Sequence, residues 1–166
     1  MMATKTASKP DVDMNRRHDR VVTTNRRAFH EYHILETVEA GIVLTGTEIK
    51  SIREGKITIS EAYARIEHGE LWLIGCHISP YSHGNRANHD PDRPRKLLLH
   101  RREIAHLRAS IEQKGLTLIP LRLHLKRGRA KLDIGIARGK KLYDKRADDA
   151  DRQSRRDIER ALRDRE

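Results

Sequence analysis

Histidine is the residue type in this chain best suited to acid–base and metal chemistry, and the sequence contains ten histidines. His83 and His89 lie in residues 79–95, a segment rich in Pro, Asn and Asp that predicts a long loop. They could serve as the acid and base of a nuclease, or could join His77 and Asp90 as ligands of a metal ion. The spacing of these four residues matches no helix-borne or Cys-based metal motif. We therefore expect no catalytic residues, no metal and no cofactor.

Positive charge is concentrated in one third of the chain. Residues 93–143 carry 15 Lys or Arg against 3 Asp or Glu, a net charge of +12. Residues 1–92 have a net charge of −1, and residues 144–166 carry 8 charges of each sign, so the whole chain has a net charge of +11. An even distribution would indicate only a soluble basic protein. Clustered charge favours a face that binds a polyanion such as a nucleic acid.

Aromatic residues are few, at 4% of the chain. Proteins that bind single strands normally stack the bases on exposed rings, and most of the rings here fall on strand positions that are expected to be buried. We therefore expect recognition of a folded RNA through its backbone and shape. A membrane surface is a weaker alternative, because the basic region predicts strands and hairpins and no long amphipathic helix.

The length of 166 residues, with about 20 flexible residues at each end, predicts one domain with a modest core. The chain has no apolar run of about 18 residues, and its first residues contain no apolar signal-peptide stretch, so a cytoplasmic protein is expected. Cys76 is the only cysteine and cannot form an internal disulfide. Its position in the strand-like run 72–78 predicts a small buried residue.

Local sequence signals divide the chain into three regions. Residues 1–24 are polar and predict a disordered N-terminal arm, residues 25–143 predict a domain of strands and helices, and residues 144–166 form a polar tail. Within the domain, Thr45 and Glu48 fit a capping box at the start of a short helix. The other elements predicted in its first two thirds are a strand over 32–44, a hairpin of 62–66 with 71–78 that turns at His68 and Gly69, and a helix over 101–114 that ends at Gly115.

A second hairpin is predicted around Lys126-Arg127-Gly128. Its first strand is expected to place these alternate residues on one face: Thr117, Ile119, Leu121, Leu123 and Leu125. Its second strand is expected to bury Ala130, Leu132, Ile134 and Ile136. About six short strands with two or three peripheral helices favour a small closed antiparallel barrel, because closure leaves no exposed sheet edge. The predicted fold class is therefore mainly β.

Several segments resemble the bacterial SsrA-binding protein family, also called small protein B (SmpB). The matching segments are spread in the family's order over residues 25–146, and they are Asn25–Ala28, Glu39–Ser51, Ser79–Tyr81, Asp90-Pro91, Arg95–Leu99 and Gly139–Arg146.

The resemblance implies an oligonucleotide-binding-type barrel that binds RNA and is not an enzyme. Members of the family bind the tRNA-like domain of transfer-messenger RNA (tmRNA, also called SsrA). With elongation factor Tu they help to bring it to stalled ribosomes for trans-translation, in which incomplete peptides are tagged. Their tail senses the empty decoding centre and mRNA channel. The implied partners are therefore tmRNA, the ribosome and elongation factor Tu.

Carried over residue by residue, the resemblance gives two sets of site residues. The tmRNA-binding role falls on Asn25, Arg26, Glu39, Gly41, Arg95, Lys96 and Leu98. The decoding-centre role falls on Lys140, Lys141, Tyr143, Asp144, Lys145 and Arg146. His100 departs from the family, which often has Asn at this position, and Asn is much the better residue to cap a helix.

The chemistry of some of these residues leaves their roles open. Arg and Lys pair readily with phosphates, but the carboxylate of Glu39 repels them. Glu39 either accepts a hydrogen bond from a ribose hydroxyl or a base amine, or it holds basic neighbours in position. Leu98 is one of three consecutive leucines, which cannot all face inward from one strand. It is either exposed to the RNA or covered by the helix that follows.

The tail and the overall function also have alternatives. Residues 144–166 combine oppositely charged pairs at helical spacing with little apolar surface, so we expect the tail to be disordered when free and helical on the ribosome. A ribosomal or initiation-factor-like RNA-binding barrel without tmRNA specificity is the alternative function.

Overall fold

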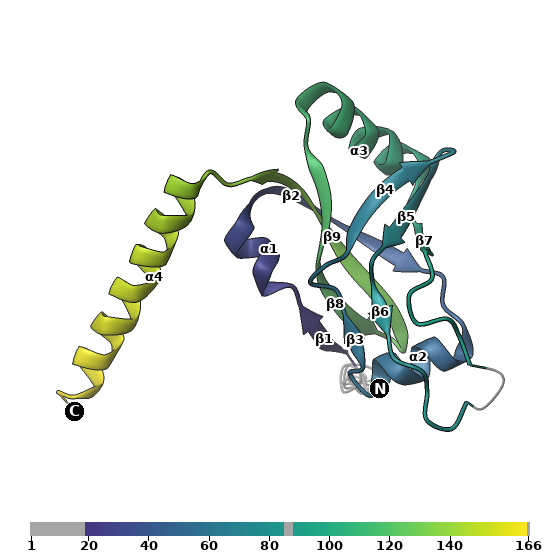
Figure 1. Cartoon of the computed structure of the whole chain (residues 1–166), viewed down its shortest axis with the longest axis horizontal. Helices are drawn as coiled ribbons and strands as arrows, with labels where there is room; N and C mark the ends of the chain where they lie inside the picture. Colours follow the sequence, from purple (N-terminus) through teal and green to yellow (C-terminus); the bar gives the residue numbers. More distant parts are fainter. Residues whose placement is uncertain (1–18, 85–87, 166) are drawn as a thin grey trace, which may run out of the picture.

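The computed structural model describes residues 19–84 and 88–165, and it consists mainly of antiparallel strands (Figure 1). Six strands close a ring in the order β8-β4-β5-β7-β2-β9 and back to β8, with β1 added at the outer side of β8. The predicted mainly-β fold with closed antiparallel strands is confirmed. The described strands are β1 (Arg20–Thr24), β2 (Tyr32–Ile42), β3 (Ile57–Thr58), β4 (Tyr63–Glu67), β5 (Glu70–Ile74), β6 (His77–Ile78), β7 (Arg95–Leu98), β8 (Thr117–Lys126) and β9 (Arg129–Gly139). The described helices are α1 (Arg26–Glu31), α2 (Gly46–Arg53), α3 (Arg101–Lys114) and α4 (Leu142–Arg163).

The local signals for helix ends and turns are confirmed. The Thr45 and Glu48 side chains form the predicted capping box of α2, and Gly115 ends α3 in the left-handed conformation with φ 63°. Both hairpins have two turn residues with positive φ, which is what tight two-residue β-turns require. His100 precedes α3 without a side-chain cap bond, as expected from the loss of Asn.

The main core fills the ring. It contains residues from every strand of the ring, among them Leu71, Leu97, Leu118, Leu123 and Leu132, all at most 1% exposed. Each such side chain stabilises the fold by about 1.5–3 kcal/mol through its removal from water. Ile52 of α2 and Leu107 of α3 are fully buried in the same core, so these two helices are held against the ring.

The predicted inward face of β8 is confirmed for Leu123 and Leu125 but wrong for the residues before them, because the strand contains a bulge. The pairing with β9 shifts between Pro120 and Arg122, so that Leu121 is an extra residue on its strand. Leu118 and Leu123 therefore face the main core, whereas Ile119 and Leu121 belong to a second cluster with Ala28 of α1 and Ala137 of β9. Gly135 makes room for the bulge, since a Cβ there would lie 2.8 Å from a methyl carbon of Leu121.

Two other strand boundaries differ from the prediction. The strand expected over 71–78 breaks at Gly75, which has φ 77°, and its last part becomes β6, which pairs with β3 in a separate small sheet. The N-terminal arm was expected to be disordered up to residue 24, but β1 pairs with β8 over Arg20–Thr24. The β-branched run Val21–Thr24 favours this strand. The rest of the arm, residues 1–18, lies outside the described residues.

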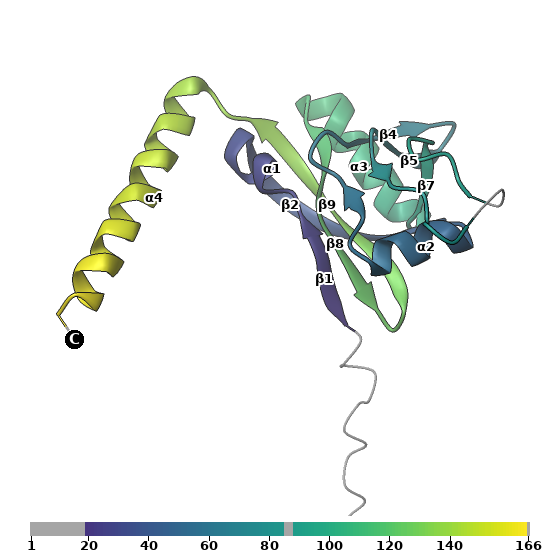
Figure 2. The ribbon, with the colours of Figure 1, turned by 60° about the horizontal axis from the view of Figure 1, so that its bottom comes forward.

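The tail also differs from the expectation of disorder, because α4 is helical from Leu142 to Arg163. The Asp144 carboxylate accepts a hydrogen bond from the Lys141 amide at 3.3 Å and so caps the first turn. Beyond its first turns α4 stands away from the ring (Figure 1, Figure 2), and its residues 151–165 are exposed. Among the described helices, none is long and apolar enough to span a membrane.

A buried ion cluster joins α2 to β7. Glu48 and Arg95 are both 0% exposed, and the Arg95 guanidinium donates to the Glu48 carboxylate and to the Cys76 carbonyl at 2.8 Å. Its remaining N–H groups donate to the carbonyls of Pro91, at 3.0 Å, and of Arg93, at 3.1 Å. The charged pair is therefore well supplied with partners, as a buried charge must be.

Glu48 is kept ionised by this cluster. Burial raises the pKa of Glu48, but hydrogen bonds from Arg93, the Thr45 amide and Arg95 outweigh that effect and lower it to about 2. Because this folded-state pKa lies below the ordinary value of 4.5, the contribution to stability is fully present above about pH 4.5. It is lost as the pH falls through about 2.

Replacing Glu48 with Gln should lower the free energy of unfolding at pH 7 by about 3–5 kcal/mol, because Arg95 is left charged and buried without its anion. Urea unfolding measures this loss. Glu54→Gln is the matched control, since Glu54 pairs with Lys56 at the surface and such pairs contribute about 0–1 kcal/mol. Equal losses in the two variants would contradict a structural role for the cluster.

Candidate nucleic-acid interface

Three of the predicted RNA-binding residues meet on the outer surface of the ring. Gly41 of β2 pairs with Leu98 of β7 on one side and with Lys131 of β9 on the other. Glu39, two residues earlier on β2, pairs with Asp133 of β9. Residues two apart on a strand face the same way, so Glu39, Gly41 and Leu98 form one continuous surface with the basic end of the β8–β9 hairpin.

This surface is hollowed beside Glu39. One depression of about 510 Å³ lies between β1 and the β8–β9 hairpin, and a second of about 540 Å³ adjoins it on the other side of Glu39 and Lys126. We call the two together the β8–β9 groove. Its charged and titratable lining residues are Asp19, Arg20, Glu39, Arg122, His124, Lys126, Arg127, Arg129, Lys131 and Asp133. Basic residues outnumber acidic ones, so the groove favours an anionic ligand.

Glu39 is held by basic neighbours within this groove. Its carboxylate lies 3.3 Å from His124 Nε2 and 3.9 Å from Lys126 Nζ, and His124 Nδ1 lies 3.9 Å from Asp133. Glu39 and Asp133 lie opposite each other on neighbouring strands, where like charges repel, and the His124 ring lies between the two carboxylates. Of the two roles left open for Glu39, these contacts support the positioning of basic residues. Its side chain is 42% exposed, so a ribose hydroxyl could also reach it.

The same three residues are the group among the described residues that could hold a metal ion. The ligand atoms of Glu39, His124 and Asp133 lie within 4.8 Å of one another. The ammonium of Lys126 already neutralises Glu39 from 3.9 Å, and a divalent cation there would be repelled by it and by the surrounding Arg and Lys residues. The arrangement therefore fits a polyanion better than a metal ion.

Leu98 is the exposed member of the three leucines, with 52% of its surface accessible. Its side chain lies over Gly41, where an added Cβ would meet the Leu98 Cβ at 3.4 Å. Lys96 lies two residues away on the same strand and pairs with Glu70 at 2.9 Å while remaining partly exposed. Leu98 and Lys96 thus extend the surface from the groove across β7. Leu98 adds an exposed apolar side chain, and Lys96 adds a basic one.

Two predicted RNA-binding side chains are not accessible. Arg95 is enclosed in the Glu48 cluster and has no exposed surface for the predicted phosphate contact. Asn25 is 2% exposed: its side-chain oxygen accepts from the Ala28 amide at 3.1 Å, and its amide donates to the Pro120 carbonyl at 2.9 Å. Asn25 therefore caps α1 and fixes that helix to β8. Arg26, next in the chain, is exposed and remains available to an RNA.

Some of the predicted decoding-centre residues are exposed, and others make hydrogen bonds within the protein. Tyr143 is 76% exposed, and Lys141 and Arg146 are exposed as well. Lys140 is different, because its ammonium donates to the Phe29 carbonyl at 3.1 Å and to Asp148. The hydrogen bond from Lys140 lowers the pKa of Asp148.

Asp144 and Lys145 lie at the first turn of α4. Asp144 Oδ2 lies 3.5 Å from His33 Nε2 on β2, and the Lys145 amide donates to the Lys141 carbonyl at 3.1 Å. Asp144 is therefore partly engaged with the ring, while the Lys145 side chain is partly exposed.

The loop histidines lie in separate structural contacts. His89 bridges Thr47 Oγ1 and the Ile78 carbonyl, each at 2.9 Å, and His77 lies 2.7 Å from Asp92. His83 packs edge-on against the Tyr81 ring. The metal-ligand group proposed for this loop is therefore not assembled among the described residues.

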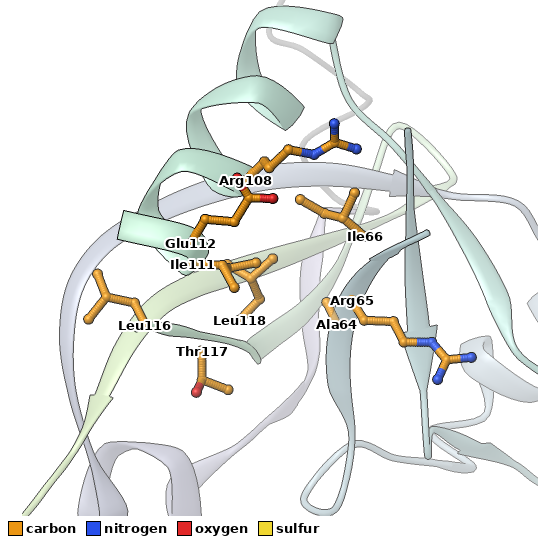
Figure 3. A pocket seen from close by; sticks show the side chains of 9 residues that line it. All are labelled: Ala64, Arg65, Ile66, Arg108, Ile111, Glu112, Leu116, Thr117 and Leu118. Atoms are coloured by element: carbon orange, nitrogen blue, oxygen red, sulfur yellow. The ribbon is translucent and has the colours of Figure 1, made fainter. Parts of the chain in front are cut away.

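A further groove of about 440 Å³ lies between α3 and the seam where β4 meets β8 (Figure 3). Its floor is apolar, with Ile66, Ile111 and Leu118, and the Arg108 and Glu112 side chains extend from α3 at its edge (Figure 3). Ala64 and Leu118 form the cross-strand pair at this seam. No predicted site residue lines this groove, which lies apart from the β8–β9 groove.

Comparison with known proteins places the chain in a family. The model of the SmpB protein family matches residues 22–164. The chain belongs to the SmpB family. The SsrA-binding protein of Carboxydothermus hydrogenoformans is 56% identical over 145 residues, which cover 87% of this chain and 97% of that protein. The SsrA-binding protein of Roseiflexus castenholzii is 58% identical over 148 residues, which cover 89% and 94%.

A solved structure shows the same relationship. The chain is similar to one in the structure described as "tmRNA-SmpB: a journey to the center of the bacterial ribosome", with a TM-score of 0.62 and 54% sequence identity. The superposition covers 74% of this chain and 85% of that chain. The family membership inferred from the short motifs is confirmed over most of the chain length.

Replacing Lys126 and Lys131 together with Ala should weaken binding of a folded RNA hairpin. The slope of log affinity against log salt should also become shallower by about 0.9 for each phosphate that the protein no longer neutralises. Fluorescence anisotropy over a salt series measures both quantities. Lys50→Ala with Lys56→Ala removes the same charge from exposed positions outside the groove and is the matched control. An equal change in the control pair would show that net charge, and not the groove, determines binding.

Proposed function

We propose that this protein binds the tRNA-like domain of tmRNA through the β8–β9 groove and the adjoining Gly41–Leu98 surface. The observation that carries the proposal is the meeting of Glu39, Gly41 and Leu98 with the basic hairpin end on one exposed surface. Lys126, Arg127, Arg129 and Lys131 supply donors to phosphates, while Leu98 offers an apolar contact to a base or ribose. The relatives named SsrA-binding proteins support this choice of RNA.

The second part of the proposal concerns the ribosome. With elongation factor Tu, the protein brings tmRNA to stalled ribosomes for trans-translation, and it acts by binding and not by catalysis. The exposed Lys141, Tyr143 and Arg146 at the base of α4 contact the decoding centre. The Arg residues along α4 contact ribosomal RNA in the empty mRNA channel, where a helix presents charged side chains on all sides. This activity places the protein in the cytoplasm.

The RNA that accompanies the protein tests the choice of partner. Purification of the chain from its own cells, followed by sequencing of the bound RNA, should give tmRNA enriched well above ribosomal and transfer RNA. The Lys126→Ala, Lys131→Ala variant should lose that enrichment. Recovery of ribosomal RNA without tmRNA would instead support a ribosomal or initiation-factor-like barrel.

A truncation tests the division of roles between ring and tail. A chain that ends at Asp144 keeps the β8–β9 groove and loses most of α4. It should bind tmRNA with nearly unchanged affinity but fail to support peptide tagging on ribosomes stalled at the end of an mRNA. Tagging at the normal rate, or a large loss of tmRNA affinity, would contradict the proposed division.

A further inference from the structure

The seam between β4 and β8 is incomplete beside the groove of about 440 Å³ shown in Figure 3, which we call the α3 groove. Ala64 and Leu118 are the single residue pair that joins these two strands. In that register the next pair would be Ile66 with Leu116, but β8 begins only at Thr117. The Leu116 amide instead donates to a carbonyl of α3 at 3.5 Å. The edge of β4 is therefore left open beside the helix.

Ile66 presents its backbone N–H and C=O groups at this open edge. The β4–β5 hairpin has a two-residue turn, so the pair beside the turn, Glu67 and Glu70, exchanges hydrogen bonds within the hairpin. Successive residues of a strand direct their backbone groups to opposite sides, and Ile66 therefore directs its own away from β5 and into the α3 groove. Among the described residues, no backbone hydrogen bond joins Ile66 to β8 or to α3. One donor and one acceptor are thus available to an added strand.

The side chains that line the α3 groove favour an aliphatic ligand group. Ile66 and Ile111 are partly exposed there, beside the buried Leu116 and Leu118. An aliphatic side chain placed on them gains about 25 cal/mol for each Å² of apolar surface removed from water. None of the described residues that line the groove carries an aromatic ring, and unstacked bases of RNA are held mainly by such rings. The lining therefore fits a peptide side chain better than a nucleotide base.

Two charged side chains of α3 lie at the edge of the groove, one helical turn apart. Arg108 extends from the helix toward the β4 side, and Glu112 lies beside it (Figure 3). Both are exposed, and neither makes an ion pair with another described residue. Arg65, the third charged residue of the lining, already pairs with Glu67 at 3.2 Å. Arg108 therefore attracts a single carboxylate, whereas the repeated phosphates of an RNA strand would also meet Glu112.

We propose that the α3 groove binds an extended peptide segment of a protein partner, which adds a short strand to the open edge of β4. One aliphatic residue of the peptide, the anchor residue, exchanges backbone hydrogen bonds with Ile66 and packs its side chain on Ile66 and Ile111. A Glu or Asp two residues from the anchor faces the same side and pairs with Arg108. The α3 groove lies apart from the β8–β9 groove, so the proposal does not depend on which RNA the protein binds.

Synthetic peptides test the site on the full chain. The probe is acetyl-Ser-Glu-Thr-Ile-Thr-Ser-amide, in which Ile is the anchor residue, together with the same residues in reverse order, because a strand can add in either direction. Isoleucine methyl groups of the protein are labelled with carbon-13 for NMR. One of the two peptides should shift the methyl signals of Ile66 and Ile111 with a Kd of about 0.1–1 mM, as expected for one aliphatic contact, two backbone hydrogen bonds and one exposed ion pair.

Methylation of single peptide nitrogens distinguishes strand addition from simple apolar binding, and it leaves the protein unchanged. A methyl group on the nitrogen of the anchor residue removes the donor to the Ile66 carbonyl and should weaken binding at least about tenfold. The N–H of the neighbouring Thr points away from β4, so methylation there should weaken binding by less than about twofold. Equal effects of the two methylations would overturn strand addition to β4.

A charge reversal tests the role of Arg108. Arg108→Glu should weaken binding of the probe about tenfold, and a probe with Lys in place of Glu should bind this variant as tightly as the original probe binds the parent chain. Arg101→Glu makes the same reversal at an exposed position of α3 outside the groove, and it should bind the original probe like the parent chain.

Three results would overturn the proposal. The first is the absence of any shift of the Ile66 and Ile111 signals with either peptide at millimolar concentration. The second is a shift of these signals by hexauridylate RNA and not by the peptides, which would make the groove a nucleotide site. The third is a shift that depends on the concentration of the protein alone, which would identify a second copy of the chain as the occupant.

Discussion

The Glu48–Arg95 pair is the constraint around which the RNA-facing side of the ring is arranged. A buried guanidinium requires acceptors on every side, and here they come from α2, from the turn between β5 and β6 and from the loop before β7. These contacts fix β7 in the ring. Because side chains alternate along a strand, placing Arg95 and Leu97 inside forces Lys96 and Leu98 outside. The buried Arg95 therefore determines which side chains of β7 are exposed beside β2, although Arg95 itself is not accessible to a ligand.

The β8–β9 groove also pairs carboxylates with basic side chains, but at the surface instead of in the core. Its carboxylates, Asp19, Glu39 and Asp133, lie among more numerous cations at the surface, where water and ligand phosphates share the charges. The interaction of Glu39 with His124 and Lys126 orders side chains that would otherwise be free to move. Ordering them before binding reduces the entropy lost when an RNA is bound. An acidic residue at an RNA interface is thus compatible with RNA binding when its role is to hold cations in place.

Much of the fold was predictable because its signals are local. The capping box of Thr45 and Glu48, the turn residues and the Gly115 helix end depend on a few neighbouring residues, and all were found from sequence. The bulge at Leu121 was not predicted, because the alternating apolar residues of this strand are also compatible with a regular strand that has all of them on one face. Gly135 on the neighbouring strand leaves the room that the Leu121 side chain occupies. Only the pairing of the two strands, in which Gly135 lies opposite Ile119, brings that space next to Leu121.

In the candidate site, too, the surroundings of single residues could not be predicted from the sequence. Motifs identified Arg95, Lys96, Lys140 and Lys141 together, because sequence reports the charge of a side chain but not its surroundings. In the fold, Arg95 is buried among acceptors beside a partly exposed Lys96, and the side chain of Lys140 is mostly covered beside an exposed Lys141. Arg95 of β7 has its carboxylate partner on α2, 47 residues away in the chain, and Lys140 has its partner on α4, 8 residues away. A basic segment can therefore bind RNA with one residue because the adjacent residue holds the backbone that presents it.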